Sequence, residues 1–138
     1  MHLKDKLRAN KPLIGTWSML PSSFSADVLT TTNLDFVIID FEHGLIDLEN
    51  YQNMVRTAEN YNLAPIIRTQ DNNKQHILKL LETGVMSIMV PHISSSKQAE
   101  KIVNYTKYKP IGKRGLSPYT RCHDYDHDVQ KMIEFKII

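Results

Sequence analysis

The sequence predicts an α/β fold built on a parallel sheet, and three observations lead to that prediction. Four short runs are apolar at nearly every position, which is typical of strands buried on both faces of a parallel sheet. A stretch with helical spacing of apolar residues follows each run, and a capping residue precedes each stretch. Repeated strand–helix units imply right-handed crossovers and parallel pairing.

The strands and the first two helices follow from local patterns. The four apolar runs are residues 13–17, 36–39, 64–68 and 87–90. The first helix is expected to begin after Ser22 or Ser23, whose hydroxyl can accept a backbone N–H. The second is expected to begin after Asp47, because apolar residues at spacings of three and four run from Leu48 to Ala58.

Two further helices are expected in the second half of the chain. Asn72 or Asn73 precedes the third, and Gly84 supplies its C-terminal stop. Ser95 and Gln98 have the spacing of a capping box before the fourth.

Two architectures accommodate these units, a doubly wound open sheet and a (β/α)₈ barrel. The chain has 138 residues, whereas a complete barrel typically needs about 250. Periodicity and length alone therefore favour the open sheet.

The composition excludes several classes of protein. The 17 basic and 15 acidic side chains leave a net charge of +2, which argues against disorder and against a dedicated nucleic-acid binder. No apolar run approaches the roughly 20 residues of a membrane span, and the start of the chain lacks the apolar region of a secretory signal. The single cysteine excludes an internal disulfide framework. We expect a cytoplasmic protein with no nucleic-acid or membrane partner.

Polar residues gather where the predicted strands end. In both architectures, functional groups lie beyond the carboxyl ends of the strands. Those ends read Trp17-Ser18, Asp40-Phe41-Glu42-His43-Gly44, Arg68-Thr69-Gln70 and Pro91-His92. An active site is therefore expected at this edge of the sheet.

His43 is the candidate general base. A histidine titrates near neutral pH, and a neighbouring carboxylate such as Asp40 or Glu42 can orient it and raise its basicity. The alternative is a polar loop that only caps a helix, and the short spacing leaves both interpretations open.

Arg68 and Glu82 also have two interpretations each. Arg68 can hold a substrate carboxylate and stabilise an enolate oxygen, or form a structural ion pair with Asp40 or Glu42. Glu82 stands near a predicted helix end, where an exposed carboxylate is the simpler interpretation and an acid behind a histidine is the alternative.

The C-terminal part of the chain holds weaker candidates. His123 and His127 would share a helix face, as zinc ligands do, but no second cluster completes a site and a solvated helix start is favoured. Cys122 has no evident base partner. A basic patch around a predicted turn could attract an anion, although a solvated turn is favoured. Its members are Lys107, Lys109, Lys113 and Arg114.

Six motifs, taken together, resemble a known family. They are Gly15-Thr16-Trp17-Ser18, residues 36–44, Pro65-Ile66-Ile67-Arg68, residues 80–84, Met89-Val90-Pro91 and residues 108–115. Their order and spacing resemble the HpcH/HpaI aldolases, the class II 2-keto-3-deoxy-acid aldolases, from about residue 3 to about residue 125.

The resemblance implies a fold, a reaction and a cofactor. Members are (β/α)₈ TIM barrels of the phosphoenolpyruvate/pyruvate type, and they are usually oligomeric. They cleave 4-hydroxy-2-oxo acids to pyruvate and an aldehyde with a divalent metal, usually magnesium, manganese or cobalt. The implied partners are therefore a small 2-oxo acid, an aldehyde and further copies of the chain.

The resemblance also assigns roles to individual residues. It implies that His43 is the base and that Arg68 binds the substrate and steadies developing negative charge, with Trp17 as a second substrate-binding residue. Glu82 matches the carboxylate that raises the basicity of the histidine, a position where the family often has Asp. Asp40 matches an acid that orders the loop.

The metal ligands of the family, a Glu and a later Asp, are expected beyond residue 138. Residues 1–138 are therefore expected to form one incomplete barrel domain, truncated after about five strand–helix units. We expect such a chain alone to bind no metal and to turn over negligibly, because class II aldol chemistry needs a cation at the enolate. Its open strand edges favour aggregation, pairing with a complementary C-terminal chain, or rearrangement. The alternative function is a non-catalytic carboxylate-binding or assembly module, or one half of a two-chain barrel.

Overall fold

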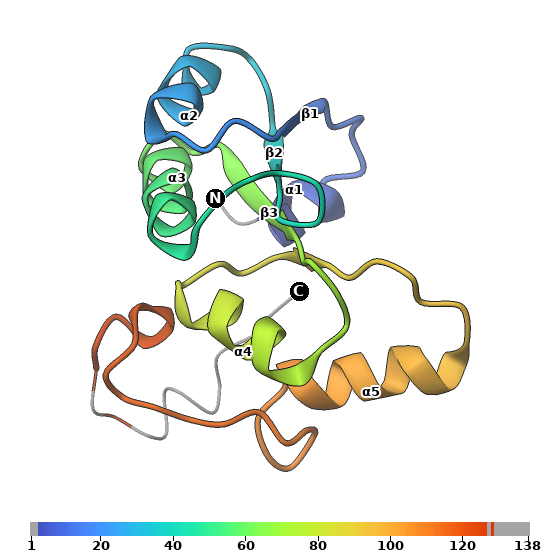
Figure 1. Ribbon diagram of the computed structural model, residues 1–138. Coiled ribbons are helices and arrows are strands. Elements are labelled where there is room, and N and C mark those ends of the chain that lie inside the picture. The colour runs from blue at the N-terminus through green and yellow to red at the C-terminus, as the bar shows by residue number, and fades with distance from the viewer. Residues whose placement is uncertain (1–2, 127, 129–138) are drawn as a thin grey trace.

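The computed structural model describes residues 3–126 and 128, which contain one parallel four-stranded sheet (Figure 1). The strands are β1 (Gly15–Ser18), β2 (Phe36–Asp40), β3 (Ala64–Arg68) and β4 (Ile88–Met89). The helices are α1 (Leu3–Arg8), α2 (Ser23–Thr30), α3 (Leu48–Asn60), α4 (Lys74–Glu82) and α5 (Ser96–Thr106), with a 3₁₀ helix at Arg121–His123. The four predicted strands are all present, and β4 is shorter than expected.

The strand order decides between the two architectures. Neighbours in the sheet are consecutive in the chain, in the order β1-β2-β3-β4, and every pair is parallel. A doubly wound sheet reverses its order at a switch point, whereas a barrel adds each strand beside the last. The open sheet favoured by length is therefore wrong, and the barrel-type arrangement implied by the resemblance is confirmed. The described residues contain four strand–helix units.

The predicted caps form as expected at four helices. The side chains of Ser22, Asp47, Asn73 and Ser95 each accept a backbone N–H from the first turn of α2, α3, α4 and α5, respectively. Gly84 follows α4 with a φ of 96°, a left-handed conformation that a residue with a Cβ adopts at a cost. The short helix α1 buries only Leu3, and no apolar stripe in the sequence predicts it.

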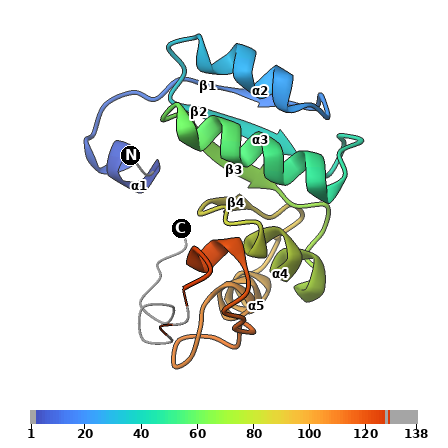
Figure 2. The ribbon, with the colours of Figure 1, turned by 90° about the vertical axis from the view of Figure 1, so that its left-hand side faces the viewer.

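The helices α2 to α5 cover one face of the sheet. Figure 2 shows α2 and α3 over β1 to β3, with α4 and α5 beside β4. Val37, Ile39 and Ile67 face these helices and are fully buried with residues of α3 and α4 in the main core. Because successive side chains alternate between faces, Ile38, Asp40 and Arg68 lie on the opposite face, which is the interior of a closed barrel. Within the described residues, no helix is long and apolar enough to cross a membrane.

Candidate active site

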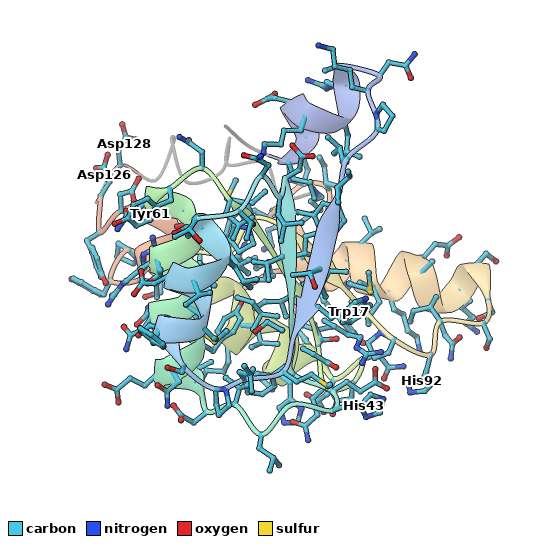
Figure 3. The ribbon with its side chains drawn as sticks, turned by 90° about the horizontal axis from the view of Figure 1, so that it is seen from above. Trp17, His43, Tyr61, His92, Asp126 and Asp128 are labelled. Carbon is cyan, nitrogen blue, oxygen red and sulfur yellow. The ribbon has the colours of Figure 1, made fainter. Side chains whose placement is uncertain are left out.

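Pairing in the sheet brings the candidate residues to one edge. In the parallel register, Asp40 at the end of β2 lies beside Arg68 at the end of β3. Trp17 points from β1 toward the same edge, where His43 and His92 also lie (Figure 3). The carboxyl edge of the sheet therefore carries the polar residues that the sequence analysis placed there.

Asp40 fixes both the strand end and the loop that follows it. Its carboxylate is 1% exposed and accepts hydrogen bonds from Arg68 Nε at 2.9 Å and Nη2 at 2.6 Å. The backbone N–H groups of Glu42 and His43 donate to the same carboxylate. The Arg68 bond, opposed by burial and aided by the loop N–H groups, lowers the pKa of Asp40. A side chain at Gly44 would collide with the backbone oxygen of Asp40, so this tight loop needs glycine there.

Arg68 lies between two carboxylates and an aromatic ring. Besides its bidentate pair with Asp40, its Nη1 lies 3.1 Å from Glu42 Oε2. Its guanidinium stacks on the ring of Trp17, with Cζ 4.5 Å from the ring centroid. The hydrogen bond to Asp40 raises the pKa of Arg68 further above its already high ordinary value. The structural ion pair, one of the two interpretations of Arg68, is thus present. The contacts to Asp40 and Glu42 use three of the five guanidinium N–H groups and leave two for a ligand.

Glu42 extends this network to two imidazoles. Its Oε1 lies 2.8 Å from His92 Nε2 and 4.0 Å from His43 Nε2. His92 was not among the predicted catalytic or binding residues. Its signal in the sequence is its position directly after Pro91, at the carboxyl end of β4.

His43 is the most accessible of the predicted catalytic residues. Its side chain is about two-thirds exposed, while its backbone is held by Asp40. An imidazole that is free on one side and fixed through its backbone can approach a ligand seated on Arg68.

The structure does not bring Glu82 to His43 within this chain. Glu82 is the last residue of α4, and its Oε2 lies 3.8 Å from Lys79 Nζ. Because α4 runs antiparallel to the strands it connects, its C-terminal end lies at the amino edge of the sheet, opposite His43. The role that the resemblance assigns to Glu82 remains a prediction.

Three of the weaker C-terminal candidates, Arg114, Cys122 and His123, form a buried cluster. His123 Nε2 lies 2.6 Å from Tyr108 Oη, and Arg114 Nη2 donates to Cys122 Sγ at 3.4 Å. His123 ends a 3₁₀ helix, and Asp124 after it takes a left-handed conformation, so no α-helix runs from His123 through Asp124. His127 lies outside the described residues. Arg114 is 6% exposed and stacks on Tyr108, so it does not belong to an exposed basic patch.

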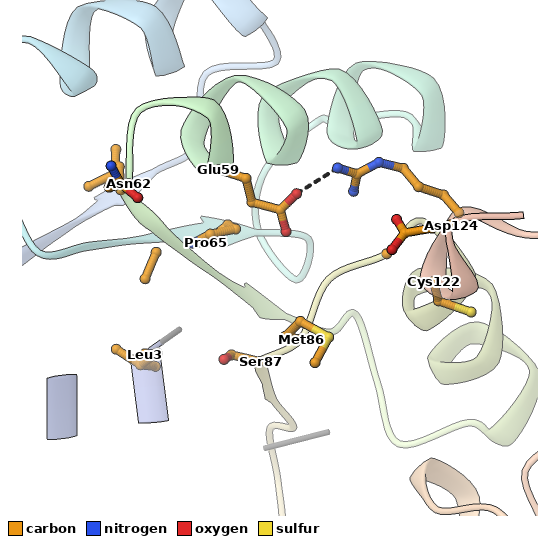
Figure 4. A pocket seen from close by; sticks show the side chains of 12 residues that line it. Leu3, Glu59, Asn62, Pro65, Met86, Ser87, Cys122 and Asp124 are labelled. Atoms are coloured by element: carbon orange, nitrogen blue, oxygen red, sulfur yellow. Dashed lines mark hydrogen bonds and ion pairs between the residues drawn. The ribbon is translucent and has the colours of Figure 1, made fainter. Parts of the chain in front are cut away.

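A pocket of about 350 Å³ opens at the amino edge of the sheet (Figure 4). Arg121 crosses it to Glu59 Oε2 at 2.6 Å and also donates to the backbone oxygen of Thr83 at 3.0 Å. Asn62 and Ser87 line the same pocket. This edge holds none of the predicted site residues except Glu82.

The described residues do not by themselves fit the metal that the resemblance implies. No three His, Cys, Asp or Glu side chains among them lie close enough together to hold a metal ion. Asp40 and Glu42, the two carboxylates at the end of β2, are both bound to Arg68. We therefore derive no step through a metal held by this chain.

Comparison with known proteins identifies the group to which the chain is related. It is 33% identical over 121 residues to a protein named pyruvate aldolase from Rhizobium etli, covering 88% of this chain and 48% of that protein. It is 32% identical over 131 residues to a 4-hydroxy-2-oxo-heptane-1,7-dioate aldolase from Klebsiella pneumoniae, covering 90% and 49%. The chain thus spans about half the length of these curated relatives.

A solved structure extends the likeness to the fold. The HpcH/HpaI aldolase/citrate lyase family protein from Burkholderia cenocepacia superposes with a TM-score of 0.87 at 25% identity, over 97% of this chain and 56% of that one. The profile of the HpcH/HpaI aldolase/citrate lyase family matches residues 13–134. The chain therefore belongs to the HpcH/HpaI aldolase/citrate lyase family, as its motifs predicted.

Proposed function

We propose that this chain is part of an aldolase that cleaves 4-hydroxy-2-oxo acids to pyruvate and an aldehyde. We further propose that the oxo acid binds at the carboxyl ends of β2 and β3. One observation carries the proposal. Arg68 lies at that edge, fixed by two carboxylates and by Trp17, with guanidinium N–H groups left for an anion. Relatives named as aldolases support the reaction.

Each residue of the site has a separate task in this proposal. Arg68 binds the carboxylate of the oxo acid and stabilises negative charge that develops as the carbon–carbon bond breaks. In cleavage, His43 takes the proton from the hydroxyl of the substrate and returns it to the carbon of the enolate, which gives pyruvate. In the reverse direction it takes the proton from the methyl group of pyruvate and returns it to the new hydroxyl. Trp17 provides the surface on which Arg68 rests, and Asp40 holds Arg68 and the backbone of His43 in place.

A divalent metal, when bound, supplies positive charge at the enolate oxygen in this chemistry. Since the described residues form no group of three metal-ligating side chains, we propose that its ligands lie outside residues 1–138. We further propose that the chain alone turns over negligibly, and that it works as a homo-oligomer or with a complementary chain.

Two measurements on the same preparation test these statements. Pyruvate should change the fluorescence of Trp17, the sole tryptophan, in a saturable way, and Arg68→Met should abolish the change. Absence of saturable binding would contradict the oxo-acid site. An aldol-addition assay with pyruvate and manganese should show negligible turnover, and strong activity that disappears in His43→Ala would contradict the proposed location of the metal ligands.

A non-catalytic carboxylate-binding module is the second candidate, because both acids at the end of β2 are bound to Arg68. The coding sequence downstream of residue 138 separates the two candidates. A continuation with a Gln-x-Glu motif and a later Asp supports the aldolase. An isolated stop, with no complementary chain, supports the module.

A further inference from the structure

His92 is connected to the proposed substrate arginine through a single carboxylate. One oxygen of Glu42 lies 2.8 Å from His92 Nε2, and the other lies 3.1 Å from Arg68 Nη1. The Glu42 side chain is only 10% exposed, whereas the His92 side chain is 78% exposed. Glu42 therefore connects the exposed imidazole of His92 to the guanidinium of Arg68.

The backbone holds His92 in this position. Its φ is 59°, in the left-handed region that few residues other than glycine occupy. Such a conformation persists where its surroundings fix it. Pro91 before it restricts the chain further.

The charges at this edge do not balance when His92 is neutral. Asp40 and Glu42 carry two negative charges and Arg68 carries one positive charge, so the three side chains together have one surplus negative charge. An anionic oxo acid approaching Arg68 meets this surplus. A proton on His92 would remove it.

We propose that His92 is a positioning residue that couples binding of a carboxylate at Arg68 to uptake of a proton. This inference rests on the proposed function, because it takes the oxo acid as the ligand of Arg68. When His92 is neutral, Glu42 has only Arg68 as a cationic partner and competes with the ligand for Nη1. When His92 is protonated, it forms a charge-assisted bond to Glu42, and Nη1 is released to the ligand carboxylate.

Three ionisable groups besides His92 belong to this network, and each can be tested separately. Glu42 contacts His92 directly, His43 lies 4.0 Å from the same Glu42 oxygen, and Arg68 binds the other oxygen. Because His43 and His92 both lie near Oε1 of Glu42, His43 is the competing explanation for any pH dependence of pyruvate binding.

The test is a pyruvate titration of the whole chain, followed by Trp17 fluorescence, between pH 8 and pH 5.5. Uptake of one proton on binding predicts that affinity rises by up to about tenfold for each unit by which the pH is lowered within this range. His92→Gln keeps an amide donor for Glu42 but cannot titrate, so its affinity should not depend on pH. His43→Gln should keep the wild-type pH dependence.

A matched control comes from a second exposed imidazole. His76 Nδ1 lies 2.9 Å from Asp71 Oδ2, an ion pair outside the Arg68 network, so His76→Gln should behave like the wild type. Wild-type pH dependence in His92→Gln, or its loss in His43→Gln, would overturn the role of His92 and leave the proposed function intact. Absence of pyruvate binding at every pH contradicts the proposed function instead.

Discussion

Arg68 and Arg121 are alike in burial and in their closest contact, yet they serve opposite edges of the sheet. Each side chain is 21% exposed, and each places Nη2 2.6 Å from a carboxylate oxygen. Arg68 has two carboxylates and an aromatic ring around it. Arg121 has one carboxylate, Glu59, and the backbone oxygen of Thr83.

The difference lies in what else the partners touch. Glu59 belongs to α3 and Thr83 follows α4, so Arg121 ties the C-terminal segment to two helix ends. The partners of Arg68 lead instead to the exposed imidazoles of His92 and His43. An arginine bound to helix ends acts as a structural tie, whereas one held between carboxylates near solvent can exchange a carboxylate for a ligand.

Replacing Arg68 should have the largest effect, on both stability and binding. Arg68→Met leaves Asp40, which is 1% exposed, without its cation. Breaking a buried ion pair from one side typically costs about 3 to 5 kcal/mol. Urea unfolding should show this loss, and the Trp17 response to pyruvate should disappear.

Arg68→Lys is the matched control because it keeps the charge and loses the bidentate geometry. It should recover part of the stability and little of the pyruvate response. Full recovery of pyruvate binding in this variant would show that a positive charge alone is sufficient for binding and that the bidentate geometry of the guanidinium is not needed.

Replacing Arg121 should reduce stability and leave binding unchanged. Arg121→Met removes the bonds to Glu59 and to the Thr83 carbonyl. Hydrogen bonds that involve a charged group contribute about 1.5 to 3 kcal/mol, and the partial exposure of this pair favours the lower end. Urea unfolding and the pyruvate titration distinguish the two arginines, and weaker pyruvate binding in Arg121→Met would contradict the division between the edges.

Replacing Gly84 disturbs the contact that Arg121 makes with the end of α4. A Cβ at this position would meet Arg121 Nη1 at 2.6 Å, in a backbone with a φ of 96°. Gly84→Ala should therefore lose about 1 to 2 kcal/mol in urea unfolding, the usual cost of a left-handed residue. Gly115→Ala is the control, since its Cβ would meet only Leu78 at 3.8 Å. Equal stability of the two variants would contradict both the backbone cost at Gly84 and the close approach of Arg121.

Local sequence patterns predicted most of the fold but not the order of its strands. The caps at Asp47 and Asn73 depend on residues two or three positions apart, and both form as expected. The order of the strands depends on pairing between residues far apart in the chain, which no local pattern contains. The motifs of the family supplied it, and length alone pointed to the wrong architecture.

The candidate site, like the fold, could be predicted only in part from the sequence. The sequence analysis named an ion pair with Asp40 or Glu42 as one of two interpretations of Arg68, and both pairs are present. The contact from Glu42 to His92 joins residues 50 positions apart, and no spacing rule predicts it. The polar ends of parallel strands indicate where a site lies, whereas the hydrogen bonds within it depend on the register of the sheet.

The two edges should also differ in their response to acid, and this is the smallest effect that we expect. Burial lowers the pKa of His123, so its contribution to stability is complete above its ordinary value of 6.5 and is lost as pH falls below it. The hydrogen bond from Arg68 lowers the pKa of Asp40, so its contribution is lost only as pH falls below 3.8. Urea midpoints should therefore decline between pH 7.5 and pH 5.5 in the wild type and less so in His123→Phe, which cannot titrate. An equal decline of the urea midpoint in both proteins would show that His123 does not cause the loss of stability between pH 7.5 and pH 5.5.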